Sequence, residues 1–399
     1  MRGANAVKKA ARKKTPGKIR EKPYEAGAGY DRSMNCLYAK RMTRLQKVSI
    51  AALITGVIYG LGSIPAVAEY VFARGLTRAC GCILNFITMW LPFSLYEIAA
   101  IALSIGGFGL LLAIIVWICR RNRKGLRTCL YRLTMAALCV LTAFGVLYAP
   151  LYERQSVYAA LGLSDAKVTQ EQVVAAAEYY VEQLNALAPR MGRDGAGNTR
   201  AELSFSQTSR ILNEELGKYG DYFNFYGVRA KPVALSVPMS YLGITGIYFP
   251  FFAEANVNTN IPPYTLPVTM AHEMAHAKGV SRENEANVTA YAVCIRSEHP
   301  YLRYSGLMSA TATLLNALPQ EEYERLYADL DEQVRQEYRN AGEHYKRYEG
   351  LTDRISSFFN DLFLKANGVQ AGTGSYGQTT GSLVALYQSL TAEENGAAS

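Results

Sequence analysis

Three charge-free apolar segments in the amino-terminal half constrain the fold of this chain more than any other feature. They cover residues 48–68, 98–119 and 133–152. Each has about the 20 residues that a helix needs to cross the hydrocarbon core of a bilayer. Backbone groups in lipid must be satisfied within the segment itself, so we expect three transmembrane helices. The sequence thus predicts a multi-pass membrane protein with the lipid bilayer as a partner.

Lysine and arginine are distributed unevenly around these segments. Residues 1–47 carry 14 basic and 3 acidic side chains, and the connection after the second segment holds six more basic residues. The connection between the first two segments has only Arg74 and Arg78. The positive-inside rule therefore predicts a cytoplasmic amino terminus and an extracytoplasmic carboxy-terminal region.

This pattern divides the chain into three parts. We expect a basic cytoplasmic tail over 1–47, a transmembrane region over 48–152, and an extracytoplasmic domain over 153–399, all at the cell membrane. The whole chain has a net charge of +9, but acidic side chains outnumber basic ones in the last part. The positive charge lies where it meets anionic lipid headgroups, so we expect no nucleic-acid partner.

Two of the four histidines in the chain lie in the segment His272-Glu-Met-Ala-His276. Residues four apart share one face of a helix, so both imidazoles can reach a single metal ion. Glu273 lies on the flank of that face, where its carboxylate can act as a general base toward water. Burying two imidazoles and a carboxylate without partners is costly, which argues against simple core packing. We therefore predict Zn²⁺ bound by His272 and His276, with Glu273 as the catalytic residue.

A catalytic zinc site needs a third protein ligand and one open position. Gly279 can end the first helix in a left-handed cap, Ser281 can cap a second helix, and that helix would carry Glu283 and Glu285. The two carboxylates lie about 200° apart on a helix, so only one can face the histidines. The spacing alone leaves both Glu285 and Glu283 open as the third ligand.

The rest of the carboxy-terminal region is predicted to be mainly helical with a small sheet, giving an α+β fold. Apolar spacing indicates helices over 168–187, 206–216 and 301–318, and a long charged helix or two over 321–364. Short aromatic and β-branched runs over 232–258 predict strands, the last of them at 247–257 before the motif helix. Pro250 favours an edge position, where an extended substrate could pair with the strand.

Several blocks of the sequence resemble known proteins. Asn284-Glu285 followed by a small residue is similar to the second-helix element of thermolysin-like (gluzincin) metallopeptidases, and this resemblance implies Glu285 as the third zinc ligand. The interval after His276 is shorter here, so Glu283 stays the alternative. Three blocks together, 248–258, 272–294 and 360–367 with Ser375-Tyr-Gly377, resemble a bacterial membrane-protein family catalogued as a domain of unknown function. The resemblance covers roughly residues 48–388 and implies a multi-pass protein with a zincin-like domain, without an assigned substrate.

These observations predict a membrane-anchored zinc metallopeptidase that hydrolyses a peptide or protein substrate on the extracytoplasmic side. Two alternatives stay open. One is a catalytically silent zinc-binding scaffold or sensor, and the other is a zinc amidase acting on cell-wall material. Glu273 argues against a protein without catalytic activity, because a structural zinc site does not need an acid/base residue beside its ligands.

Overall fold

A computed structural model of the protein describes residues 42–164, 167–350, 352, 354 and 376–397. The elements below belong to one compact unit, Arg44–Ser399. The basic tail up to residue 41 and the block 360–367 with Ser375 lie outside the described residues. Within the described part, the fold is mostly helical with one small sheet, which confirms the predicted α+β class.

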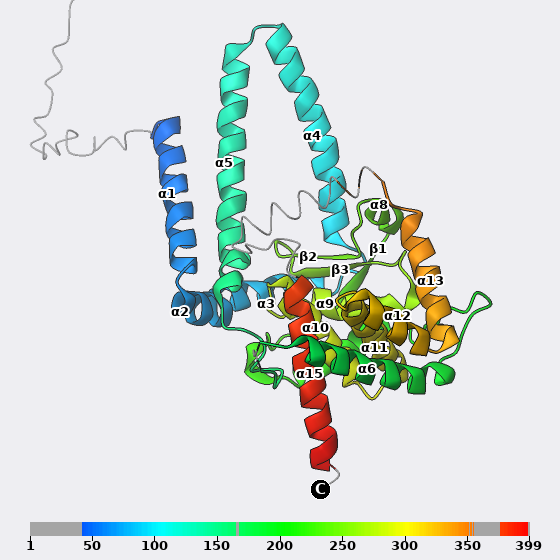
Figure 1. The fold of residues 1–399 in the computed structure, drawn as a ribbon. Helices are drawn as coiled ribbons and strands as arrows, with labels where there is room; N and C mark the ends of the chain where they lie inside the picture. The colour runs from blue at the N-terminus through cyan, green and yellow to red at the C-terminus, as the bar shows by residue number, and fades with distance from the viewer. Residues whose placement is uncertain (1–41, 165–166, 351, 353, 355–375, 398–399) are drawn as a thin grey trace, which may run out of the picture. The chain divides into compact units, whose positions relative to one another are not determined.

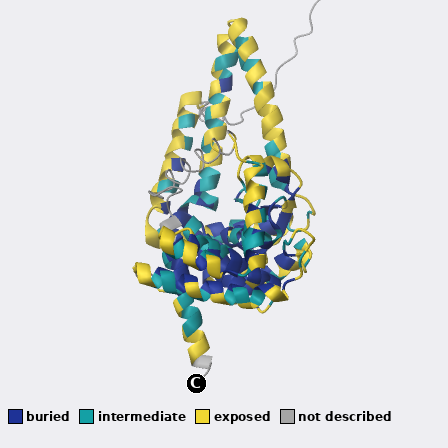
Figure 2. Ribbon diagram, turned by 45° about the vertical axis from the view of Figure 1, so that its right-hand side comes forward, coloured by how far each residue is buried: buried dark blue, intermediate teal, exposed yellow. Residues whose placement is uncertain are grey.

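Three described helices are long and apolar enough to cross a membrane, as predicted (Figure 1). They are α1 (Arg44–Gly62), α4 (Leu95–Cys119) and α5 (Arg123–Leu147). Figure 2 shows them largely exposed, whereas the interior of the carboxy-terminal domain is buried. Their bounds differ from the predicted spans, most clearly in α5, which ends at Leu147. Residues 149–153 form a separate 3₁₀ turn, η2 (Ala149–Glu153), because Pro150 cannot continue the α-helical hydrogen bonding.

The connection between the first two long helices is itself helical, where the sequence suggested only a loop. A short α2 (Pro65–Val67) leads into a π-helical segment, η1 (Ala68–Leu76), and then into α3 (Thr77–Thr88). One face of α3 packs on the carboxy-terminal domain. Asn85 Nδ2 donates to the carbonyl of Gly227 at 2.6 Å, and Thr88 Oγ1 donates to that of Phe252 at 3.1 Å.

The carboxy-terminal domain begins with two helices close to the predicted ranges. Helix α6 (Gln170–Leu187) and helix α7 (Phe205–Gly217) each start at a capping box, with Thr169 and Ser204 as the N-caps. A capping box satisfies two backbone donors that are otherwise unpaired at a helix start. The remaining short elements of this part are η3 (Ala188–Arg190), η4 (Gly220–Tyr222) and α8 (Ser236–Tyr241).

The helices after the sheet form most of the buried core. They are η5 (Pro263–Thr265), α9 (Leu266–Ala277), α10 (Glu283–Ile295), α11 (Pro300–Leu315), α12 (Gln320–Asp329), α13 (Glu332–Lys346) and α15 (Tyr376–Ala397). The charged stretch from 321 is thus two helices in its described part. The break falls at Leu330, which is extended, and Asp331 caps the second helix.

The sheet has three short strands in the order β1-β3-β2. Strand β1 (Ala230–Val233) is parallel to β3 (Glu254–Asn258), and β2 (Gly246–Phe249) is antiparallel to it. The single strand expected over 247–257 is therefore a hairpin. Pro250 lies in its turn, because proline cannot donate to a sheet ladder. The edge strand that the sequence predicted from Pro250 is β2.

A cluster of paired polar groups, which we call the sheet–helix junction, joins the sheet to the start of α4. Lys231 Nζ contacts the Glu254 carboxylate at 2.5 Å, and the same carboxylate accepts from the backbone N–H of Tyr96 at 3.1 Å. Ser94 Oγ donates to Asn256 Oδ1 at 2.6 Å. The Glu97 carboxylate accepts from two backbone N–H groups just after β1. The strands next to α9 are thus fixed relative to α4.

Candidate metal centre

Helix α9 carries both motif histidines on one face. His272 is partly exposed and His276 is buried, and their Nε2 atoms lie 3.1 Å apart. His276 Nδ1 lies 2.6 Å from the carbonyl of Val280. A carbonyl only accepts, so Nδ1 donates to it, and Nε2 is the ring nitrogen that faces His272. The helix and the turn after it therefore orient both rings toward one point.

The turn between α9 and α10 brings Glu283 to the two histidines. Gly279 has a φ of +100°, a left-handed conformation that favours glycine, and it ends the first helix as the sequence predicted. Helix α10 starts at Glu283, so its first side chain is the one nearest α9. The Glu283 carboxylate lies 3.3 Å from His272 Nε2 and 3.7 Å from His276 Nε2.

The structure brings Glu283, the alternative, to the two histidines, and not Glu285, the predicted third ligand. Glu285 is buried on another face of α10, and its carboxylate accepts from Arg282 Nη1 at 2.8 Å. The expected cap is also different. Arg282 is the N-cap of α10, and Ser281 Oγ makes no hydrogen bond to any residue that the structure describes. The turn between α9 and α10 is short. It therefore places Glu283, the first residue of α10, next to α9 and leaves Glu285, the third, facing elsewhere.

The three candidate ligand atoms form a triangle that fits a zinc ion. In a tetrahedral site with bonds of about 2.0–2.1 Å, neighbouring donor atoms lie roughly 3.3 Å apart. The two Nε2 atoms lie 3.1 Å apart, and the Glu283 carboxylate approaches them to 3.3 Å through Oε2 and 3.7 Å through Oε1, distances close to that value. Among the described residues, this is the group of histidine, cysteine and acidic side chains whose ligand atoms converge closely enough for one metal ion. Two imidazoles and a carboxylate are also a donor set that zinc accepts.

Electrostatics favour a cation at this cluster. Burial alone lowers the pKa of His276, but the facing Glu283 carboxylate outweighs burial and raises it to about 9. Burial alone raises the pKa of Glu283, and the two histidines reverse that effect and lower it below its usual range. The cluster therefore attracts positive charge strongly, whether as protons or as a metal ion.

Glu273 lies on the other side of the motif, against strand β2. Burial raises the pKa of its carboxyl, although the neighbouring histidines partly oppose this, and the backbone N–H of Tyr248 donates to it. Gly246 packs directly on this side chain, since a Cβ there would lie 2.5 Å from Glu273 Oε1. Only glycine permits such close approach of a strand to the carboxylate. The outer edge of β2 therefore faces Glu273.

Three tyrosines lie near the cluster, and the sequence did not predict them as part of the site. Tyr148 Oη lies 3.2 Å from His276 Nδ1, and the Tyr148 ring lies 5.7 Å from that of Tyr152 and 5.6 Å from that of Tyr248. Tyr148 and Tyr152 were assigned to the third span. Their spacing of four residues at the end of an apolar segment, where tyrosine is enriched at membrane interfaces, was the available signal.

Two arginines, the partly exposed Arg282 and the buried Arg154, support the turn that carries Glu283. Arg282 donates to the backbone carbonyls of Tyr152 at 2.9 Å and Arg154 at 2.8 Å. Arg154 in turn donates to the carbonyl of Gly279 at 2.8 Å and pairs with Glu69 at 3.2 Å. Segment η1, which carries Glu69, and the end of η2, with Tyr152 and Arg154, thus hold the ligand-bearing turn in place.

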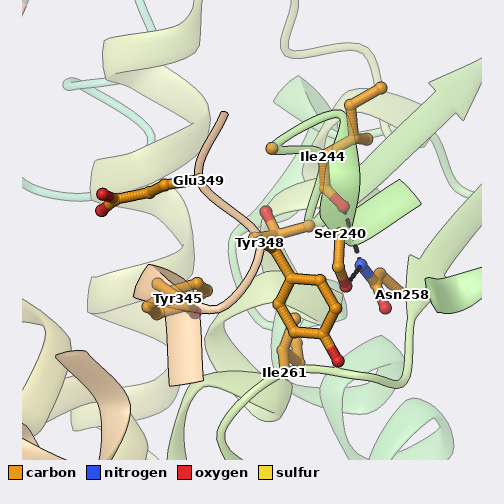
Figure 3. Close-up of a pocket in the computed structure, with 9 residues that line it drawn as sticks. Ser240, Ile244, Asn258, Ile261, Tyr345, Tyr348 and Glu349 are labelled. Atoms are coloured by element: carbon orange, nitrogen blue, oxygen red, sulfur yellow. Dashed lines mark hydrogen bonds between the residues drawn. The ribbon is translucent and has the colours of Figure 1, made fainter. Parts of the chain in front are cut away.

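A separate cavity of about 150 Å³ lies at the start of β2 (Figure 3). Thr245, which precedes the first residue of β2, lines it together with Ile244, Ile261, Tyr345 and Tyr348. None of its lining residues belongs to the candidate metal centre. The cavity is nevertheless adjacent to the strand that contacts Glu273.

The fold and site define a mainly helical protein with three apolar helices and a His-His-Glu cluster beside a small sheet. The chain belongs to the family described as protein of unknown function (DUF3810), whose profile matches residues 72–384. The match includes α4, α5, the sheet and every residue of the candidate metal centre. No curated protein and no solved structure matches the chain.

Proposed function

We propose that this protein is a membrane-anchored, zinc-dependent metallopeptidase. The observation that carries the proposal is the convergence of the ligand atoms of His272, His276 and Glu283 within 4.8 Å of one another, with Glu273 buried alongside. A zinc ion held by these three residues would supply Lewis-acid chemistry, polarising a carbonyl and lowering the pKa of water. The exposed edges of His272 and Glu283, whose side chains are 17% and 36% accessible, leave an approach for a substrate.

Glu273 is the residue suited to proton transfer. Its carboxylate is buried beside the ligand cluster, and burial raises its pKa above that of an ordinary glutamate. A base with such a pKa can take a proton from the attacking water and pass it to the departing amine. Catalysis of this kind typically contributes about 10²–10⁴-fold to a rate.

Strand β2 is the element suited to substrate binding. It is an edge of the sheet, and its outer side faces Glu273 through the N–H of Tyr248. An extended peptide can add to such an edge through main-chain hydrogen bonds, while neighbouring pockets select side chains. The mostly apolar cavity beside Thr245 is suited to an apolar substrate side chain. These features favour a peptide or protein substrate.

The distribution of charge supports an extracytoplasmic site. Arg120, Arg121, Arg123 and Lys124 lie at the connection between α4 and α5, whereas the candidate metal centre lies by the other ends of these helices. Basic connections stay on the cytoplasmic side in most membrane proteins. The site would then face away from the cytoplasm.

The test combines metal analysis with a cleavage assay on the purified full-length protein. We expect one zinc ion per chain and cleavage of casein or of a mixed peptide library by the wild type. Glu273→Gln should keep its zinc and lose at least about 100-fold in rate. Equal zinc content without cleavage by either protein would contradict the proposal and indicate a zinc-binding scaffold or sensor. Cleavage restricted to cell-wall fragments would indicate an amidase.

A further inference from the structure

The candidate metal centre lies immediately beside the end of a membrane-spanning helix. Tyr148 directly follows Leu147, the last residue of α5, and its hydroxyl lies 3.2 Å from His276 Nδ1. One side chain therefore bridges the end of the helix and a candidate zinc ligand. The headgroup layer on each side of a bilayer is about 6 Å thick. The metal centre thus lies at the depth of this layer or just outside it.

Strand β2, the edge strand, is held at the same depth as the candidate metal centre by contacts with the start of α4. The ring of Tyr96, in the first turn of α4, lies 5.3 Å from that of Phe249 at the end of β2. The sheet–helix junction fixes the neighbouring strand β3 to the start of α4. Strand β2 therefore runs between the points where α4 and α5 leave the apolar layer.

Helix α3 provides an independent indication that the domain is held against the membrane. Its domain-facing residues Asn85 and Thr88 are buried, as described above. Its opposite face exposes large apolar side chains, and the turn after α3 adds another; these are Ile83, Phe86, Ile87 and Trp90, each at least 60% exposed. An amphipathic helix with an exposed aromatic face is typical of elements that lie in the membrane interface.

We infer that the substrates are membrane-anchored polypeptides, cleaved within a few residues of the point where their own transmembrane helix leaves the bilayer. This inference rests on the proposed metallopeptidase function. A segment leaving the bilayer beside α4 and α5 reaches the edge of β2 without further extension. A soluble peptide must instead enter the headgroup layer to meet the same strand. Anchoring also raises the local concentration of the substrate at this depth.

The test uses the full-length wild-type protein in phosphatidylethanolamine–phosphatidylglycerol liposomes. A pool of reporters is reconstituted with it, each with one transmembrane helix, a randomised 30-residue extramembrane segment and a folded reporter domain. A second pool carries the same segments and reporter without the helix. Mass spectrometry of the released reporters gives the cleavage positions, and Glu273→Gln provides the background.

We expect cleavage positions to cluster within the first several residues after the helix, and the soluble pool to be cleaved at least about tenfold more slowly, as an effective-concentration advantage predicts. Cleavage spread evenly along the segment, or equal rates for both pools, would overturn this inference while leaving the peptidase function intact. A zinc-loaded wild type that cleaves neither pool would overturn the peptidase function itself, and this inference with it.

Discussion

The sheet–helix junction and the candidate metal centre are both polar clusters beside the ends of the long apolar helices, but they satisfy their charges differently. At the junction, Lys231 Nζ contacts Glu254 and the carbonyls of Thr88 and Phe93, so all three ammonium donors have acceptors. At the metal centre, ligand atoms of His272, His276 and Glu283 face one another across a partly exposed space.

The difference separates a structural role from a chemical one. Charges that are paired within the protein hold elements together, and they leave nothing for a ligand. Ligand atoms of three side chains that converge on one point can bind a cation, and side chains with perturbed pKa values are common at functional sites. The junction therefore fixes the strands, and the metal centre is the part available for chemistry.

The largest expected effect follows from removing a histidine of the metal centre. His276→Ala should reduce the zinc content from one ion per chain to less than about a tenth, because three protein ligands are the minimum for such a site. Metal analysis after dialysis measures the loss. His344→Ala is the matched control, since His344 Nε2 contacts the carbonyl of Asn260 outside the cluster. Retention of zinc by His276→Ala would refute the assignment.

The next effect distinguishes the two glutamates of α10. Glu283→Gln should weaken zinc binding by at least about 100-fold, because an amide is a poor substitute for a carboxylate ligand. Glu285→Gln makes the same chemical change beside Arg282 and should leave zinc affinity nearly unchanged. Competition with a chromogenic chelator measures both. The reverse order of effects would restore Glu285 as the ligand.

A smaller effect, on stability alone, is expected at the junction. Lys231→Met leaves the buried Glu254 carboxylate without its cation and should cost about 3–5 kcal/mol. Thermal unfolding in detergent measures it, and zinc binding should persist in the folded protein. The exposed pair Arg210–Glu214 supplies the control, since Arg210→Met should change stability by less than about 1 kcal/mol. Loss of zinc without loss of stability would contradict the distinction between the two regions.

The smallest effect is a pH dependence at Glu69, which is buried against Arg154. Burial alone raises the pKa of Glu69, but hydrogen bonds from Arg154 and Arg74 outweigh burial and lower it. A lowered folded-state pKa stabilises the protein above the ordinary glutamate pKa, and that contribution is lost as the pH falls through the lowered value.

Glu69→Gln should therefore be less stable than the wild type near pH 7, by about 1.5–3 kcal/mol, the range for hydrogen bonds to charged groups. The gap should shrink as the pH falls below about 4.5, the ordinary glutamate range. Unfolding of the zinc-free proteins between pH 7 and pH 4 measures it. A constant gap would show that Glu69 stabilises the turn without its charge.

Helices and helix ends were predicted correctly where the pattern of neighbouring residues determines them. The spacing of apolar residues in α6 and the left-handed Gly279 both lie where the sequence indicated. The failures lie where distant segments meet. Tyr148 was predicted to lie in a membrane span because it belongs to an apolar segment. Its contact with His276, 128 positions away, depends on the packing of the domain.

The sequence by itself determined that the chain has three apolar spans and that His272, Glu273 and His276 share one helix, because charge depletion and helical periodicity are properties of contiguous residues. Tertiary structure alone decided that Glu283 completes the cluster, that β2 lies against Glu273, and that the site adjoins the ends of α4 and α5. These outcomes depend on the direction in which a four- or five-residue turn sends the next element. That direction is fixed by contacts such as Arg282 with Tyr152, which join residues far apart in the chain.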